Sequence, residues 1–142
     1  MADIERGRSM SFDIFLQCYR NGEPATFKRS VFNEIFETET DSRDPDFEQP
    51  RYSDGSGGDI YVDADDIQTI MFNHCGGDIF WAKLYELLYV TQSVIFWPEV
   101  KGNNSVIANT EALKHLPSVW VEDFGEVHIA HNGHELEAVI FA

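Results

Sequence analysis

The segment 12–19 alternates between two kinds of side chain with the period of two residues that is typical of a β-strand. One side of the predicted strand is entirely apolar and consists of Phe12, Ile14, Leu16 and Cys18. The other side is mixed and consists of Asp13, Phe15, Gln17 and Tyr19. Because an apolar strand face has to be buried, this segment predicts a sheet with a second layer packed against one of its sides.

Two segments show the periodicity of a helix. Over 26–37, apolar side chains recur at every fourth position, and Thr26 is the predicted N-cap. A clearer helix is predicted to follow the glycine pair 76–77, with Asp78 as its N-cap. The apolar stripe of this second helix consists of Phe80, Leu84, Leu87 and Leu88.

Turn signals separate the other predicted elements. Residues 54–58 form the glycine-rich tip of a predicted hairpin between 51–53 and 59–62. Beyond this hairpin we expect strands over 67–74 and 94–97, a short helix over 109–116 and extended chain over 119–121.

The C-terminal segment contains Asn132-Gly133, the strongest short signal for a two-residue hairpin turn. Strands over 126–131 and 134–141 would flank this turn and pair His131 with His134. Alternation then places five apolar side chains on one face of the hairpin: Val127, Ile129, Leu136, Ala138 and Ile140.

Together these elements predict an α+β fold, with a mostly antiparallel sheet of about six or seven strands, two or three packed helices and a C-terminal β-hairpin. A chain of 142 residues predicts a single domain. We expect this domain to span residues 10–142, and residues 1–9 to form a flexible N-terminal extension that contributes little to the fold.

The chain is strongly acidic, because 25 Asp and Glu residues outnumber 10 Lys and Arg residues and give a formal net charge of −15. Such a surface repels phosphate backbones and anionic lipid, which argues against nucleic-acid and membrane partners. No apolar run approaches the ~20 residues that span a bilayer, and residues 1–9 lack the apolar core of a secretory signal. We therefore expect a cytoplasmic protein in which Cys18 and Cys75 are reduced.

No motif for catalysis or cofactor binding is present. The sequence lacks GxSxG, HExxH and CxxC, and the loop 54–58 has neither the spacing nor the lysine of a phosphate-binding loop. We assign no catalytic, cofactor-binding or metal-binding residues, and this absence favours a protein that is not an enzyme. One alternative stays open: a small metal-dependent enzyme or ligand-binding domain would use His131 and His134 at the tip of the predicted hairpin.

Acidic residues concentrate in the stretch 34–48, where Arg43 is the only basic residue. An acidic rim around an aromatic anchor is typical of a surface that steers toward a basic protein and then grips it. The predicted partner-binding residues are Glu37, Glu39, Asp41, Asp44, Asp46, Phe47 and Glu48.

Several stretches of the chain resemble uncharacterised small bacterial proteins. The residues that carry this resemblance are SFDIFLQC at 11–18, RNGEPATF at 20–27, GDIY at 58–61 and SVIFWP at 93–98. In size and acidity the chain is also similar to the immunity proteins of bacterial toxin systems. This second resemblance implies an inhibitor that neutralises a basic bacterial toxin by stoichiometric occlusion, with the stretch 34–48 as its contact surface.

Overall fold

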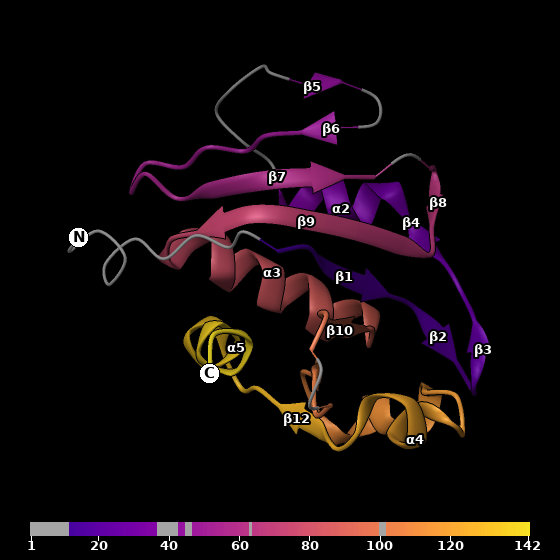
Figure 1. Ribbon diagram of the computed structural model, residues 1–142. Helices are drawn as coiled ribbons and strands as arrows, with labels where there is room; N and C mark the ends of the chain where they lie inside the picture. Colours follow the sequence, from indigo (N-terminus) through magenta and orange to yellow (C-terminus); the bar gives the residue numbers. More distant parts are fainter. Residues whose placement is uncertain (1–11, 37–42, 45–46, 63, 100–101) are drawn as a thin grey trace.

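The computed structural model describes residues 12–36, 43–44, 47–62, 64–99 and 102–142, with the backbone alone at 43, 44 and 47. Within these residues, eight strands form one sheet in the order β12-β11-β10-β1-β9-β7-β6-β5 (Figure 1). The strands are β1 (Ile14–Gln17), β5 (Arg43–Asp44), β6 (Phe47–Glu48), β7 (Gly57–Tyr61), β9 (Thr69–Gly76), β10 (Val94–Phe96), β11 (Ser105–Ile107) and β12 (Val127–Ile129). Neighbours run antiparallel except β11 and β12, which are parallel. The predicted extension 1–9 lies outside the described residues.

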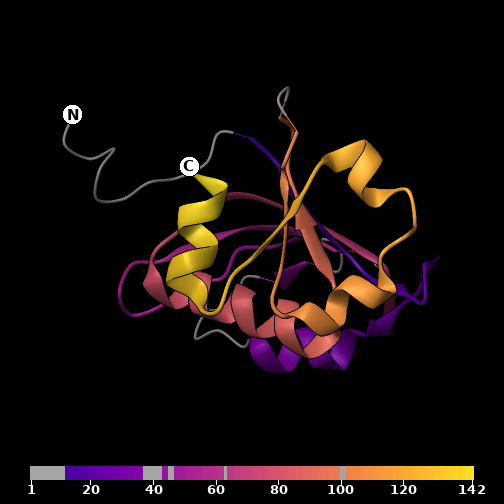
Figure 2. The same ribbon diagram turned by 90° about the horizontal axis from the view of Figure 1, so that it is seen from below.

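Two helices cover one face of the sheet, namely α2 (Arg29–Ile35) and α3 (Asp78–Thr91), as Figure 2 shows. Two short strand pairs flank this arrangement: β2 (Tyr19–Arg20) with β3 (Glu23–Pro24), and β4 (Phe27–Lys28) with β8 (Asp66–Ile67). The predicted α+β class with a mostly antiparallel sheet is confirmed. The prediction of Thr26 as a helix N-cap is wrong, because β4 intervenes and Lys28 is the residue that precedes α2.

The main core lies between the sheet and these two helices. The predicted apolar face of the first strand is confirmed for Ile14, Leu16 and Cys18, which are all fully buried, whereas Phe12 precedes β1 and is half-buried against the same core. The predicted stripe of α3 is buried against it and consists of Phe80, Leu84, Leu87 and Leu88. Aromatic rings connect the two layers, because the ring centroids of Phe72 on β9 and Phe80 on α3 lie 6.3 Å apart. This is the side of the sheet on which the alternation in the sequence predicted a second layer.

A smaller core lies on the opposite face, at one end of the sheet. It contains Val94, Ile107, Ala112 and Trp120. The chain over this end forms a 3₁₀ helix, η1 (Thr110–His115), and the short helix α4 (Trp120–Phe124). The prediction of extended chain over 119–121 is therefore wrong. The ring of Trp120 stacks on Phe124 with centroids 4.1 Å apart, and this packing is available only when residues 120–124 are helical.

The start of α3 is capped by the hairpin loop and not by its own first residues. Oδ2 of Asp54 accepts a hydrogen bond from the Ile79 amide at 3.2 Å, and Oγ of Ser56 accepts one from the Phe80 amide at 3.2 Å. The N-cap position is Gly77, so the prediction of Asp78 as the N-cap is wrong. Gly77 has a φ of +96°, and a Cβ at this position would lie 1.9 Å from Cβ of Ser56. The glycine-rich loop thus satisfies the first free amides of the helix, which is why the loop and helix must approach so closely.

The predicted C-terminal hairpin does not form. Residues 127–129 form β12, which pairs with β11, whereas residues 133–140 form the helix α5 (Gly133–Ile140). Asn132 is the N-cap of α5, because its Oδ1 accepts a hydrogen bond from the Glu135 amide at 2.8 Å. Oε1 of Glu135 in turn accepts a hydrogen bond from the His131 amide at 2.8 Å. Asn132-Gly133 therefore starts a helix where the sequence predicted a turn.

Tight packing on α3 decides between these two outcomes. A Cβ on Gly133 would lie 2.7 Å from the backbone nitrogen of Ala82, so the two helices touch backbone to backbone. Leu136 and Ile140 follow on the same side of α5 and are buried in the main core. Their spacing of four residues is that of a helix face.

Both cysteines are free thiols in buried positions. In the described part of the chain, no helix combines the length and the apolar character that crossing a bilayer requires.

Candidate functional site

The two faces of the sheet are covered unequally. Helices α2 and α3 cover one face, and α4 packs over β10 and β11 on the other (Figure 2). Figure 1 is drawn from this second side and shows no described helix in front of β1, β9 and β7. We call the outward side chains of these strands, with the residue before β1, the open face: Asp13, Phe15, Gln17, Asp59, Tyr61, Thr69, Met71 and Asn73. Each of them is exposed or half-buried.

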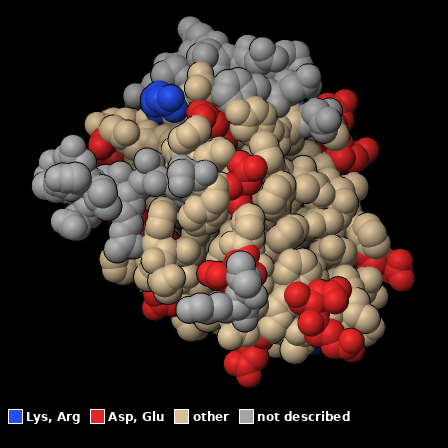
Figure 3. All heavy atoms as spheres, viewed as in Figure 1, with Lys and Arg blue, Asp and Glu red and all other residues tan. Residues whose placement is uncertain are grey.

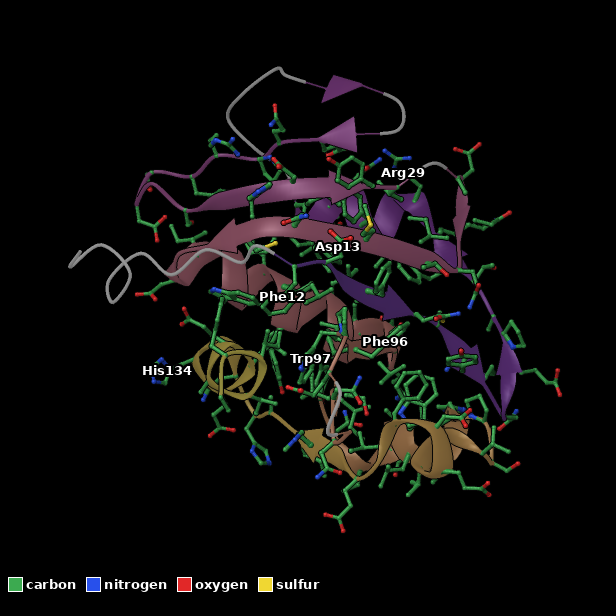
Figure 4. The ribbon with its side chains drawn as sticks, viewed as in Figure 1. Phe12, Asp13, Arg29, Phe96, Trp97 and His134 are labelled. Atoms are coloured by element: carbon green, nitrogen blue, oxygen red, sulfur yellow. The ribbon has the colours of Figure 1, made fainter. Side chains whose placement is uncertain are left out.

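An apolar row crosses the open face. The strand register places Phe15 and Tyr61 on either side of Met71. We call these three residues the apolar row. Tyr61 is 41% exposed. The row continues to Phe96, whose ring stacks on Phe15 with centroids 5.4 Å apart. Phe96 also contacts Trp120 and Phe124, and Figure 4 shows it between β1 and α4. The apolar row is thus the uncovered continuation of the smaller core.

A second row, which we call the acidic row, lies next to the apolar row. Each of its members is two residues away, on the same strand or directly before it, from a member of the apolar row. The acidic row consists of Asp13, Asn73 and Asp59, with the amide between the two carboxylates. Nδ2 of Asn73 donates a hydrogen bond to Oδ1 of Asp13 at 2.6 Å. The two oxygens of Asp59 accept from Nε2 of Gln49 at 3.0 Å and contact Nδ1 of His74 at 2.9 Å. These contacts hold both carboxylates in fixed positions beside the apolar row.

A β-bulge in β9 aligns the acidic row. Gly57 pairs with Gly76 but Asp59 pairs with Asn73, so β9 has one more residue than β7 between these two pairs. His74 occupies the bulge with a φ of +55°, a conformation that few residues other than glycine adopt. The bulge brings the His74 ring to the carboxylate of Asp59 on the neighbouring strand.

The open face carries carboxylates that no lysine or arginine on the same strands offsets. Neither Lys nor Arg occurs in β1, β7 or β9. Figure 3 shows this side of the molecule as a broad uncharged area with acidic side chains within and around it and little basic surface. The arrangement suits a partner that combines apolar side chains with positive charge.

Cys75 lies on the buried side of β9, behind the acidic row. Burial raises the pKa of its thiol well above the ordinary value, and the negative charge of Asp59 raises it further. A thiol with such a pKa stays protonated at neutral pH and is a poor nucleophile. The arrangement therefore offers no support for thiol chemistry at this site.

The predicted partner-binding residues have three different outcomes. Glu37, Glu39, Asp41 and Asp46 lie outside the described residues. Asp44 belongs to β5 and Phe47 to β6, and only the backbone of these two residues is described. Phe47 is in register with Tyr61 of the apolar row. Glu48 is a correction, since it is only 4% exposed and its Oε2 lies 3.0 Å from Nη2 of Arg29. Its carboxylate is enclosed beside Arg29 and is not presented to a partner.

His131 and His134 do not lie at a hairpin tip, because residues 133–140 form α5. Nδ1 of His131 lies 2.9 Å from Oε1 of Glu135, and His134 projects from the first turn of α5 away from the sheet (Figure 4). His134 lines a shallow pocket of about 260 Å³ together with Asp78, Trp81 and Glu137. Among the described residues, no three His, Cys, Asp or Glu side chains converge closely enough to hold a metal ion.

Sequence reasoning missed most of the open face. The signal was present in two short segments, Asp13-x-Phe15 and Asp59-x-Tyr61, in which a carboxylate and an aromatic ring share one side of a strand. Aromatic side chains on the mixed side of a strand are candidates for a binding surface. The strand order that brings the two segments together could not be deduced from the sequence.

No protein-family model, no curated protein and no solved structure matches this chain.

Proposed function

We propose that this protein is an acidic protein-binding module that binds a basic protein stoichiometrically, in the manner of an immunity protein that occludes a basic toxin. The open face is its contact surface. Strands β5 and β6, which belong to the acidic stretch 34–48, continue the sheet next to β7, and the charge of this stretch steers the partner toward the open face.

One observation carries this proposal: the apolar row and the acidic row lie side by side on a sheet face that no described helix covers. Protein interfaces place aromatic and methionine side chains at their centre, and charge complementarity sets the choice of partner. Phe15, Met71 and Tyr61 supply the apolar centre. Asp13 and Asp59 supply the charge that selects a basic partner.

The experiment is an affinity capture from the source organism with three immobilised baits: the wild type, Tyr61→Lys and Tyr89→Lys. Tyr89 is the matched control, because it is 50% exposed on α3, on the opposite side of the sheet. Bound proteins are identified by mass spectrometry, and a captured protein is then purified and its stoichiometry measured by calorimetry.

We expect a basic protein that binds one to one, that high salt releases, and that Tyr61→Lys loses while Tyr89→Lys retains. Equal capture by all three baits would show that the open face is not the contact surface. A partner that is acidic or neutral would contradict the proposed charge complementarity.

A further inference from the structure

The open face contains the same two-residue combination twice. Asp13 and Phe15 lie two positions apart on one side of β1, and Asp59 and Tyr61 lie two positions apart on one side of β7. Residues two positions apart on a strand are separated by about 6.7 Å along it. A single side chain of a partner that approaches the open face from solvent can therefore contact both members of one combination. We call these combinations the two Asp-aromatic pairs.

The strand order aligns the two pairs with each other. Both β1 and β7 are antiparallel to β9, so they run parallel to each other. Phe15 and Tyr61 are both in register with Met71, and the carboxylates of Asp13 and Asp59 flank Asn73. Since β9 separates β1 from β7, the two pairs lie about 10 Å apart, which is two strand spacings. Figure 4 shows Asp13 beside β9 on this side of the sheet.

We propose that the two Asp-aromatic pairs bind two arginine side chains of the partner. This inference rests on the proposed function and names the chemistry by which the partner is recognised. In each pair the carboxylate accepts the N–H groups of a guanidinium, and the aromatic ring lies where the guanidinium plane can stack on it. Met71, between the pairs, contacts the methylene groups of both arginines. Lysine offers neither the planar fork nor the stacking surface, so it fits this arrangement less well.

The two pairs contribute in different ways. Asn73 engages Oδ1 of Asp13, which leaves Oδ2 to accept donors from the partner, whereas the ring of Phe15 is half-buried against Phe96. Both oxygens of Asp59 already have a partner, and its side chain is 17% exposed, whereas Tyr61 is 41% exposed. Hydrogen bonding to the carboxylate therefore dominates at the first pair, and stacking on the ring dominates at the second.

The separation of about 10 Å matches residues i and i+7 on one side of an α-helix, which rises 1.5 Å per residue. The probe is a capped, alanine-rich helical peptide with arginines at i and i+7. Three control peptides carry lysine at both positions, citrulline at both positions, or arginines at i and i+5, which point to different sides of the helix. Binding is followed by NMR through the methyl group of Met71, assigned with Met71→Leu.

We expect the i, i+7 arginine peptide to shift the Met71 methyl signal and to bind about 3- to 10-fold more tightly than any control peptide. Asp13→Asn and Tyr61→Ala should each weaken binding about 3-fold or more. The matched control Glu86→Gln removes one exposed carboxylate from α3, on the far side of the sheet, and should leave binding unchanged. Melting temperatures of all variants verify that they fold.

The inference would be overturned if the lysine peptide bound as tightly as the arginine peptide, or if the i, i+5 peptide bound as tightly as the i, i+7 peptide. Shifts that depend on peptide charge but spare Met71 would also overturn it, because they indicate general attraction to an acidic protein. If the arginine peptide fails while the captured partner still distinguishes Tyr61→Lys from Tyr89→Lys, only the arginine inference falls. If the peptide binds as expected but the captured partner does not distinguish these baits, the proposed function falls instead.

Discussion

Strands β1, β7 and β9 have one face that is buried under helices and one face, the open face, that is not. On β9, Phe72 is fully buried beneath α3, whereas the next residue toward the N-terminus, Met71, lies half-buried on the open face. On β1, Leu16 is fully buried and Phe15 is only partly covered. Both faces carry large apolar side chains, so hydrophobicity alone does not decide which face is packed. The difference lies in which face the chain covers with helices, and an apolar face left uncovered is a candidate for binding.

The largest expected effect separates the two faces by substitution of adjacent residues. Phe72→Ala should lower the free energy of unfolding by about 3–5 kcal/mol, because it empties space in the main core. Met71→Ala should lower it by about 1 kcal/mol or less, since this side chain already contacts solvent. Urea unfolding of the two variants measures the difference. Equal losses would mean that the open face is packed as tightly as the main core.

A second substitution weakens the packing of α4 on β10 and β11, at the covered end of the same side of the sheet as the open face. Trp120 is 4% exposed, and its Nε1 donates a hydrogen bond to Oγ of Ser105 at 3.0 Å. Trp120→Ala should cost about 3 kcal/mol, and it should also accelerate hydrogen exchange of the amides in β11, which α4 covers. Unchanged protection of β11 would show that α4 does not cover this end of the sheet in solution.

A smaller effect tests how the loop 54–58 caps α3, the helix on the buried face of the sheet. Ser56 is 3% exposed, and its Oγ accepts the hydrogen bond from the Phe80 amide. Ser56→Ala leaves this amide without its partner and should cost about 1–2 kcal/mol. Ser53→Ala in the same loop is the control, since Ser53 is exposed and should change stability little. If the two variants unfold alike, the loop does not cap the helix.

The smallest effect depends on pH. Hydrogen bonds from Ser56 lower the pKa of the Asp54 carboxyl, and the hydrogen bond from the Ile79 amide adds to this shift. A carboxyl whose pKa is lower in the folded state stabilises the fold above its unfolded pKa, and this contribution is lost as the pH falls through the folded pKa. The wild type should therefore lose more stability than Asp54→Asn when urea unfolding is repeated below about pH 4. Parallel pH profiles would contradict this assignment.

Local sequence patterns predicted well which side chains face the main core. The alternation of Ile14, Leu16 and Cys18 and the helical stripe of α3 were both correct, because each depends on the periodicity of one element. Caps were predicted less well. Asp78 occupied the expected sequence position, yet the amides at the start of α3 are satisfied by Asp54 and Ser56, which lie more than twenty residues earlier in the chain. No window of neighbouring residues contains that information.

Asn132-Gly133 shows most clearly what a local signal leaves open. The dipeptide is compatible with a hairpin turn and with a helix start, and Glu135 three residues after Asn132 is the signal that could have favoured the helix. The backbone contact between Gly133 and Ala82 is possible only after α3 has formed, and it requires residues 133–140 to pack on α3 as a helix and not to pair with β12. Contacts with segments far away in the chain therefore decided between the two structures.

The sequence by itself determined the α+β class, the acidic charge and the apolar sides of β1 and α3, because composition and periodicity are properties of single segments. Only the tertiary structure decided that Asp13-x-Phe15 and Asp59-x-Tyr61 lie side by side across β9, and that Glu48 is enclosed with Arg29. Strand order and register join residues that are far apart in the chain, and they follow from the packing of the whole domain. The open face exists only at that level.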